Sequence, residues 1–354
     1  MIAISAGSRA LLRVVIVAFA ALVSAGVPGA RTSRVASRPL ARGQTSARAA
    51  SSGTTYYVAP NGSDANSGTS ANRPWRTVER VNSAPLKPGD RVLFRGAARF
   101  SDSDLEPDAS GTAGASISYG SYGTGQAHLT YGVWFNNHDD LTFDNLALGP
   151  QDGFQGGSNY GPKVNHIVLE NSTISLSAHN ADVGVYSNGN DWTIKGNKIE
   201  NIGNSGMLLN GDRYTISGNT ITNVGLDSAI RFDKHGIYLV VSNATVTDNH
   251  ISHFQADGIS PRMRNSTISG NVISNGEVGI GFFEQDRIGG TSHWTHNTIT
   301  GTTLACVYID GRAGGLLRTH ESFVVTYNTL RPARGPAVRL VHTTGTYLAR
   351  ENRR

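Results

Sequence analysis

The stretch Tyr214–Ile221, YTISGNTI, is one of four closely matching copies of a short pattern. The other copies are WTIKGNKI at residues 192–199, ATVTDNHI at residues 244–251 and STISGNVI at residues 266–273. Each copy places Thr before an apolar residue and places Ile two residues after an Asn. Looser copies are centred on Asn145, Asn171, Asn297 and Asn328. Such self-similarity indicates a repeat protein, so the period of the repeat is the next quantity to establish.

A second pattern, a glycine followed by an apolar residue, alternates with the first. It occurs at Gly132, Gly184, Gly206, Gly236, Gly258 and Gly279, and Cys306 and Ala337 take the glycine position in two further copies. Five of these positions precede the next asparagine by 13 residues, and four asparagines precede the next copy by nine. The basic repeat is therefore 22 residues long.

Each repeat predicts three short strands, because alternating apolar residues are separated by Gly, Asn and Asp rather than spaced as in a helix. A unit of this size cannot close its own core, so stacking of the units into a parallel coil has to bury one continuous apolar column. The recurring Asn fits a structural ladder, in which each side chain bonds its counterpart in the next coil.

Composition agrees with an all-β chain and excludes several classes. Charged residues make up 16% of the 354 residues and glycine accounts for 42 of them, which is unlike a coiled coil. The chain has one cysteine, so a disulfide framework and a cysteine-rich zinc site are both excluded. We expect Cys306 to be a small buried residue.

The net charge of +5 comes from the first 50 residues, which hold seven arginines and no acidic residue. Arg9 and Arg13 precede an apolar run from Val14 to Val23, which predicts a signal peptide at residues 1–25. Residues 26–52, rich in Arg, Ser, Ala and Thr, predict a disordered linker. We therefore expect a secreted protein, extracellular or periplasmic, that is a monomer and is not held in a membrane after cleavage. The body is nearly neutral, which excludes a nucleic-acid footprint.

The opening of the body, residues 53–354, carries a family resemblance. Residues 56–64 read YYVAPNGSD, and PWRTV at residues 74–78 and PGDRVLF at residues 88–94 follow. This segment resembles the start of many secreted bacterial proteins of the right-handed parallel β-helix, pectate-lyase-like superfamily. The resemblance implies an all-β right-handed parallel β-helix solenoid and a carbohydrate substrate. A short helix from Trp75 to Ala84 is expected to cap the first coil.

Departures from the 22-residue period indicate functional loops, because rigid scaffolds carry function on insertions. Insertions follow Asn219, Gly279 and Cys306. The first precedes the glycine-containing strand and the other two follow it, so we expect them to form opposite walls along the outer face of that strand, whose residues strand parity gives. We expect this face to bind a polysaccharide, since tyrosine rings stack on sugars and polar groups bond hydroxyls. The substrate-binding residues that we predict are Tyr186, Asn210, Arg231, Arg264, Glu284, Tyr308, Asp310 and Arg312.

A lyase acting on a uronate-containing glycan needs a cation beside the carboxylate and a base for the adjacent C–H. The string RFDKHGIY, residues 231–238, offers Lys234, His235 and Tyr238 as the base. Arg262, one coil further, is the candidate carboxylate clamp. Lys234 and Arg262 differ by six strand positions, about 20 Å on a straight strand, so they can share one sugar only if the inserted loop folds back. These four residues are the predicted catalytic set, and β-elimination is the predicted reaction.

Alternatives stay open at this stage. His235 has the parity of the inward residues and shares its column with Asp257, so a structural His–Asp pair is as good an interpretation as a catalytic dyad. A hydrolase or epimerase could use the same groove, but no pair of carboxylates is singled out by spacing. A non-catalytic glycan-binding or surface protein is the alternative of a different class. No cofactor is indicated with certainty; calcium is possible in the Asn61, Asp64 and Asn66 turn, which lacks a full calcium loop.

Overall fold

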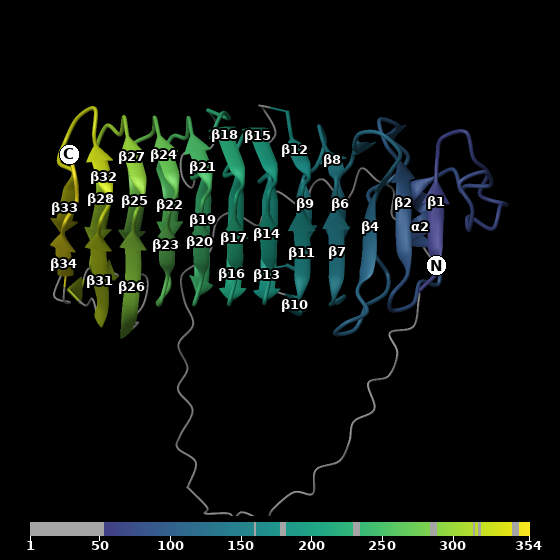
Figure 1. Ribbon diagram of the computed structural model, residues 1–354, viewed down its shortest axis with the longest axis horizontal. Helices are drawn as coiled ribbons and strands as arrows, with labels where there is room; N and C mark the ends of the chain where they lie inside the picture. The colour runs from purple at the N-terminus through teal and green to yellow at the C-terminus, as the bar shows by residue number, and fades with distance from the viewer. Residues whose placement is uncertain are drawn as a thin grey trace, which may run out of the picture. The chain divides into compact units, whose positions relative to one another are not determined.

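The computed structural model describes residues 53–158, 161–177, 182–228, 234–283, 289–313, 316–317, 320–341 and 347–354, with backbone alone for 289 and 312–321. The chain is an all-β right-handed parallel β-helix, in which successive coils follow one another along the axis (Figure 1). Three parallel sheets, A, B and C, form its sides. The signal peptide at 1–25 and the linker at 26–52 lie outside the described residues and stay predictions.

Sheet A holds the Thr-containing strand of each repeat, and its β14, β17, β20 and β23 are the four copies of the opening pattern. The strands in order are β1 (Thr55–Val58), β2 (Arg91–Arg95), β4 (Ile117–Tyr122), β7 (Leu141–Asp144), β11 (Ile167–Glu170), β14 (Thr193–Lys195), β17 (Thr215–Ser217), β20 (Thr245–Thr247), β23 (Thr267–Ser269), β26 (Gly289–Thr295), β31 (His320–Thr326) and β34 (Tyr347–Arg350).

Sheet B follows sheet A in each coil, and from Asn197 to Asn328 its strand begins directly after the ladder asparagine. Its strands are β3 (Arg99–Phe100), β5 (Ala127–Leu129), β8 (Leu146–Leu148), β12 (Thr173–Ser175), β15 (Lys198–Ile202), β18 (Thr220–Val224), β21 (His250–Ser252), β24 (Val272–Ser274), β27 (Thr298–Thr300) and β32 (Thr329–Arg331).

Sheet C holds the strand that follows the recurring glycine. Its strands are β6 (Val133–Phe135), β9 (Phe154–Gly156), β13 (Val185–Asn190), β16 (Met207–Asp212), β19 (Ile237–Ser242), β22 (Asp257–Pro261), β25 (Val278–Phe283), β28 (Ala305–Asp310) and β33 (Val338–Val341), with β10 (Val164–Asn165) beside β13. A small antiparallel pair, β29 (Arg312–Ala313) and β30 (Leu316–Leu317), lies off the coil sheets.

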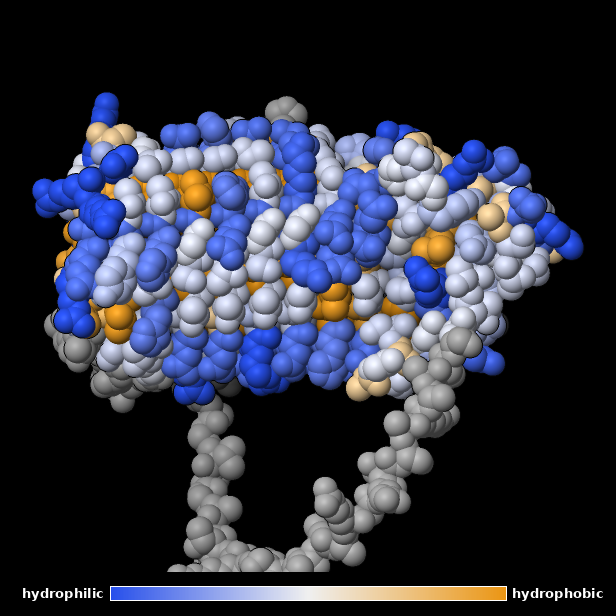
Figure 2. All heavy atoms as spheres, in the orientation of Figure 1, coloured by the Kyte–Doolittle hydropathy of each residue, from blue (hydrophilic) through white to orange (hydrophobic). Residues whose placement is uncertain are grey.

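One apolar column fills the coil, as the repeat predicts. Ile194, Ile216, Val246 and Ile268 of sheet A are in register and completely buried, and the corresponding isoleucines of sheet B join the same cluster. Figure 2 shows one face of the coil, where hydrophilic and near-neutral side chains cover all but narrow apolar seams. Cys306 is buried in this core, as expected, and burial raises the pKa of its thiol.

The asparagine ladder is confirmed. Asn197 Nδ2 donates to Asn219 Oδ1 at 3.0 Å, and Asn219 Nδ2 donates to Asn249 Oδ1 at 2.9 Å. The same bonds continue through Asn271, Asn297, Asn328 and Asn352. Each buried amide therefore satisfies backbone and side-chain groups of two coils at once.

Two of the looser copies were placed wrongly on the ladder. Asn145 and Asn171 have φ angles of 57° and 50°, which puts them at left-handed corners that Asn tolerates well. The ladder position one residue later belongs to Ser172, whose backbone N–H donates to Asn197 Oδ1 at 2.9 Å. The side chain of Asn171 instead donates to Asp144 on the outside of the coil.

The first coil is capped by the short helix α2 (Val78–Asn82), which lies within the predicted range. Thr77 is its N-cap and accepts a hydrogen bond from Arg80 N. Val78 and Val81 are buried in the core of the coil, beside Trp75. The helix thus closes the apolar column at this end.

Candidate functional site

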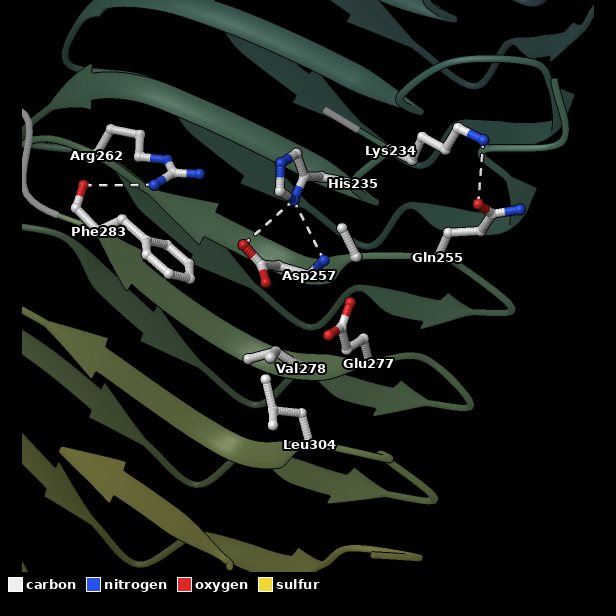
Figure 3. A pocket seen from close by; sticks show the side chains of 10 residues that line it. Lys234, His235, Gln255, Asp257, Arg262, Glu277, Val278, Phe283 and Leu304 are labelled. Atoms are coloured by element: carbon white, nitrogen blue, oxygen red, sulfur yellow. Dashed lines mark hydrogen bonds and ion pairs between the residues drawn. The ribbon is translucent and has the colours of Figure 1, made fainter. Parts of the chain in front are cut away.

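A pocket of about 380 Å³ lies on the outer face of sheet C, where β19, β22, β25 and β28 run side by side (Figure 3). Polar side chains of both charges line it together with apolar ones. The lining residues are Lys234, His235, Gln255, Ala256, Asp257, Arg262, Glu277, Val278, Phe283 and Leu304.

The pocket is built mainly from residues that precede each strand of sheet C. Backbone bonds from Ala256 N to Lys234 O and from Leu304 N to Glu277 O stack these segments coil upon coil. Ala256 therefore lies in the coil between those of Lys234 and Glu277. Its small side chain leaves a hollow between the Lys234 ammonium and the Glu277 carboxylate.

The inward direction predicted for His235 is wrong, although its column with Asp257 is confirmed. A Cβ atom added to Gly236 would lie 2.6 Å from Ile251 Cγ2, so this glycine faces the core as Ile237 does. Gly258 faces Ile273 in the same way. Strand alternation does not extend through these glycines, and the residue before each one turns outward into the pocket.

His235, Asp257 and Ser260 form a buried polar chain. The Ser260 hydroxyl donates to Asp257 Oδ2 at 2.6 Å, and that oxygen lies 3.2 Å from His235 Nδ1. The backbone N–H of Asp257 also lies 3.2 Å from Nδ1 and can donate to it. His235 and Asp257 are each 4% exposed, so this chain holds the imidazole in a fixed orientation.

Arg262 is held between two aromatic rings. Its Cζ atom lies 4.9 Å from the ring centroid of Tyr238 and 4.6 Å from that of Phe283. Nη1 donates to Phe283 O at 3.4 Å, while the buried Nε has no hydrogen-bond partner among the described residues. No carboxylate of the described part of the chain forms an ion pair with this guanidinium. Among the described residues, the charge of this guanidinium is thus balanced by no carboxylate.

The structure brings the four predicted catalytic residues together. Tyr238 stacks on the His235 ring, with centroids 5.1 Å apart, and also contacts Arg262. Lys234 is 7% exposed, and its Nζ donates to Gln255 Oε1 at 3.1 Å at the far end of the pocket (Figure 3). Lys234 and Arg262 thus line one pocket despite their separation in sequence. Residues 229–233 of the insertion before Lys234 lie outside the described residues.

The predicted substrate-binding residues divide into three groups. Tyr308 and Asp310 are half-buried on the pocket side of the face, in the rows that parity predicted. Tyr186 and Asn210 lie nearer the first coils, and Tyr186 is 7% exposed, so burial raises its pKa to about 12. Arg264 is exposed at the corner beyond β22.

Three further predictions cannot be placed. Arg231 and Glu284 lie outside the described residues, and Arg312 begins β29 without a described side chain.

The predicted catalytic and substrate-binding residues do not make up the whole pocket. Phe283, Gln255 and Glu277 also line it, and Asp257 is part of it rather than of the core. Ala256, Ser260 and Gly281 carried the signal, because small residues between larger ones on an outer sheet face mark a hollow.

The polar side chains of the N-terminal turn form hydrogen bonds within the protein. Asp64 Oδ1 accepts hydrogen bonds from Arg76 N and Thr77 N, and Oδ2 accepts one from the Thr77 hydroxyl. The Asn66 amide donates to Pro74 O. Within the described ranges, no group of three or more His, Cys, Asp or Glu residues is arranged to hold a metal ion. The same ranges contain no helix that is long and apolar enough to cross a membrane.

Comparison with known proteins agrees with this architecture. Residues 183–353 match the family model described as the right handed beta helix region. An 86-residue part, 23% of the chain, is 44% identical to a lacto-N-biosidase of Bifidobacterium longum subsp. longum, but covers only 5% of that protein.

Two solved structures share the fold. The GH136 lacto-N-biosidase from Eubacterium ramulus has a TM-score of 0.54 and 15% identity, over 85% of this chain and 67% of its own. The alginate lyase from Paenibacillus sp. str. FPU-7 has a TM-score of 0.50 and 16% identity, over 75% of this chain and 97% of its own. At these identities the likeness shows the fold alone.

Proposed function

We propose that this right-handed parallel β-helix protein is an exported polysaccharide lyase that cleaves a uronate-containing glycan by β-elimination in the sheet C pocket. The observation that carries the proposal is Arg262, whose guanidinium faces the pocket without a carboxylate partner among the described residues. A planar guanidinium with open donors matches the geometry of a sugar carboxylate. The match of an 86-residue part of the chain to a lacto-N-biosidase supports a glycan substrate.

The first step of the proposed reaction is neutralisation of the uronate. Arg262 binds the C6 carboxylate and makes the C5 proton more acidic, because the negative charge that develops at C5 spreads onto the carboxylate. A base removes this proton. The electron pair forms the C4–C5 double bond, and the glycosidic oxygen at C4 leaves with a proton from the pocket or from water.

His235 is the base in this mechanism. The neutral imidazole has two tautomers. With the proton on Nε2, Nδ1 accepts a hydrogen bond from the backbone N–H of Asp257. With the proton on Nδ1, the Nδ1–H group donates to the Asp257 carboxylate and Nε2 carries the lone pair. The second form can accept the C5 proton, and the carboxylate stabilises the imidazolium that results. Ser260 fixes the carboxylate, so Asp257 and Ser260 act as positioning residues.

Lys234 and Tyr238 have supporting roles in this proposal. Lys234 contributes a second positive charge at the end of the pocket, and Gln255 holds its ammonium. Tyr238 supports both His235 and Arg262 through its ring.

One observation favours a second function, glycoside hydrolysis. Asp257 and Glu277 both line the pocket, and the first is buried whereas the second is exposed. Two carboxylates in different environments are the set that a glycosidase uses. The Asp257 carboxylate is already engaged by Ser260 and His235, which is why elimination is the first proposal.

The test uses purified protein and a panel of pectic, alginate, glycosaminoglycan and neutral polysaccharides, with and without calcium. Ultraviolet absorbance of the unsaturated uronate reports elimination, and new reducing ends report any cleavage. The mechanism is supported by a rise in absorbance that is abolished in His235→Gln. Tyr238→Phe and Lys234→Met should each reduce this rise without abolishing it. Reducing ends without absorbance would replace it by hydrolysis, and the absence of both signals would overturn both reactions.

A further inference from the structure

Stacked side chains continue from the pocket along the face of sheet C. The Tyr238 ring contacts Arg262, Arg262 contacts the Phe283 ring, and Phe283 stacks on Tyr308 with centroids 5.1 Å apart. Arg339 Cζ then lies 5.6 Å from the centroid of the Tyr308 ring. Three aromatic rings and two guanidinium groups from successive coils thus form one continuous stack.

The two arginines of this stack share one property. Within the described part of the chain, neither Arg262 nor Arg339 forms an ion pair with a carboxylate. Arg339 is exposed on β33, and the aromatic ring beneath it keeps its guanidinium over the sheet face. A second cation is therefore presented on the same surface as the pocket.

The spacing of the two cations follows from the sheet. Arg262 follows β22 and Arg339 lies in β33, with β25 and β28 between these strands. Three steps between neighbouring strands span about 14 Å along the coil axis. An extended glycan covers such a distance with several sugar residues.

We propose that Arg339 and Tyr308 form a second anionic subsite, which binds the carboxylate of another uronate residue of the chain that reacts at Arg262. The inference rests on the proposed function and specifies its substrate class, a polyuronate that lies along the coil axis. Tyr308 supplies a stacking surface beside the charge, as Tyr238 and Phe283 do at Arg262. The polymer binds more tightly than a dimer because it engages both guanidinium groups.

Binding measurements test the subsite separately from catalysis. Isothermal titration calorimetry compares dimers and hexamers of galacturonate, mannuronate and guluronate on the His235→Gln protein, where turnover is blocked. Arg339→Gln is expected to weaken binding of the best hexamer about tenfold, the loss of one charge-assisted contact, and to leave dimer binding unchanged. Arg350→Gln removes the same charge from sheet A near the same end and is expected to change neither value.

The outcomes separate the two proposals. Equal hexamer affinity with and without Arg339 overturns the subsite, as does failure of every hexamer to bind. An Arg339→Gln protein that melts earlier but keeps the ratio of hexamer to dimer affinity shows a stack with a structural role alone, which also overturns it. Hexamer binding that depends on Arg339 in a protein without elimination activity would keep the subsite and refute the chemistry.

Discussion

Arg262 is the residue on which the proposed chemistry depends most directly. Arg262→Gln is expected to lower kcat/KM for elimination at least 100-fold, because the charge that acidifies C5–H is lost. Arg262→Lys is expected to recover only part of this loss, since an ammonium keeps the charge but not the planar fork between Tyr238 and Phe283. Initial rates on the substrate that the screen selects measure both effects, with Arg350→Gln as the charge-matched control. Full activity of Arg262→Gln would refute its role.

Asp257 is expected to act through His235. Asp257→Asn keeps the size of the side chain but no longer favours a proton on His235 Nδ1, so we expect kcat to fall about 100-fold with little change in KM. The pH–rate profile should change shape, because the carboxylate no longer stabilises the imidazolium. Loss of thermal stability without a change in the profile would instead mark a structural pair.

Strand alternation predicts side-chain direction within β19 but not before it. Parity along β19 correctly placed Tyr238 on the outer face, because the strand alternates regularly from Ile237 onward. It failed at His235, since Gly236 and Ile237 both face the core. Alternation applies only inside a strand, and the sequence does not mark where the strand begins.

Each asparagine of the ladder is expected to contribute to the stability of the fold. Asn249→Ala removes the acceptor of Asn219 N and the donor to Ile216 O, both buried, so unfolding should become about 2–4 kcal/mol easier. Urea denaturation measures the change. Asn72→Ala, at an exposed position, is the control and should be nearly neutral. A ladder variant as stable as the control would show that water replaces these bonds.

The N-terminal turn has a stability contribution that depends on pH. Burial raises the pKa of Asp64, but hydrogen bonds from Arg76 N, the Thr77 hydroxyl and Thr77 N outweigh it and leave the pKa below its ordinary value. A folded-state pKa below the unfolded value stabilises the fold above about pH 4, and the contribution is lost as pH falls through the folded-state pKa.

Asp64→Ala is therefore expected to lower stability by about 1–2 kcal/mol at neutral pH. The difference from the wild-type protein should shrink as pH falls below about 4, which denaturation curves at several pH values measure. A difference that stays constant down to pH 2 would mean that the carboxylate charge has no part in it.

The elements that repeat were the most predictable part of the molecule. The patterns at Asn197, Asn219, Asn249 and Asn271 set both the strands and the ladder, because each coil needs the same bonds as the next. Asn171 shows the limit, since an asparagine suits both a left-handed corner and the ladder position that follows it. Only the register against Asn197 tells the two positions apart.

For the whole molecule, the coil turns sequence separation into short distances. Tyr238 and Tyr308 are 70 residues apart in sequence, yet they lie in one row of sheet C. The period predicted this row, but it did not predict the pocket, which depends on how Arg262 packs between the rings of Tyr238 and Phe283. Side-chain direction across coils is set by packing, which a repeat pattern does not encode.

The position of Arg339 relative to Arg262 sets an expected direction for the bound chain. If a polyuronate extends from Arg262 toward Arg339, a bound hexamer should protect Phe283 and Tyr308 from hydroxyl-radical labelling. Tyr327, 54% exposed at a corner beyond sheet A, is the internal control and should keep its labelling rate. Trp134, 37% exposed, lies in the row of Tyr238 but four strands toward the first coil, so it should also stay unprotected.

Protection of Trp134 in place of Tyr308 would show that the chain runs the other way from the pocket, and the cation at Arg339 would then have no part in binding. Protection of neither residue would confine the glycan to the pocket itself. The labelling pattern therefore reports the direction of the bound substrate, because Trp134, Tyr238 and Tyr308 lie in one outer row of sheet C.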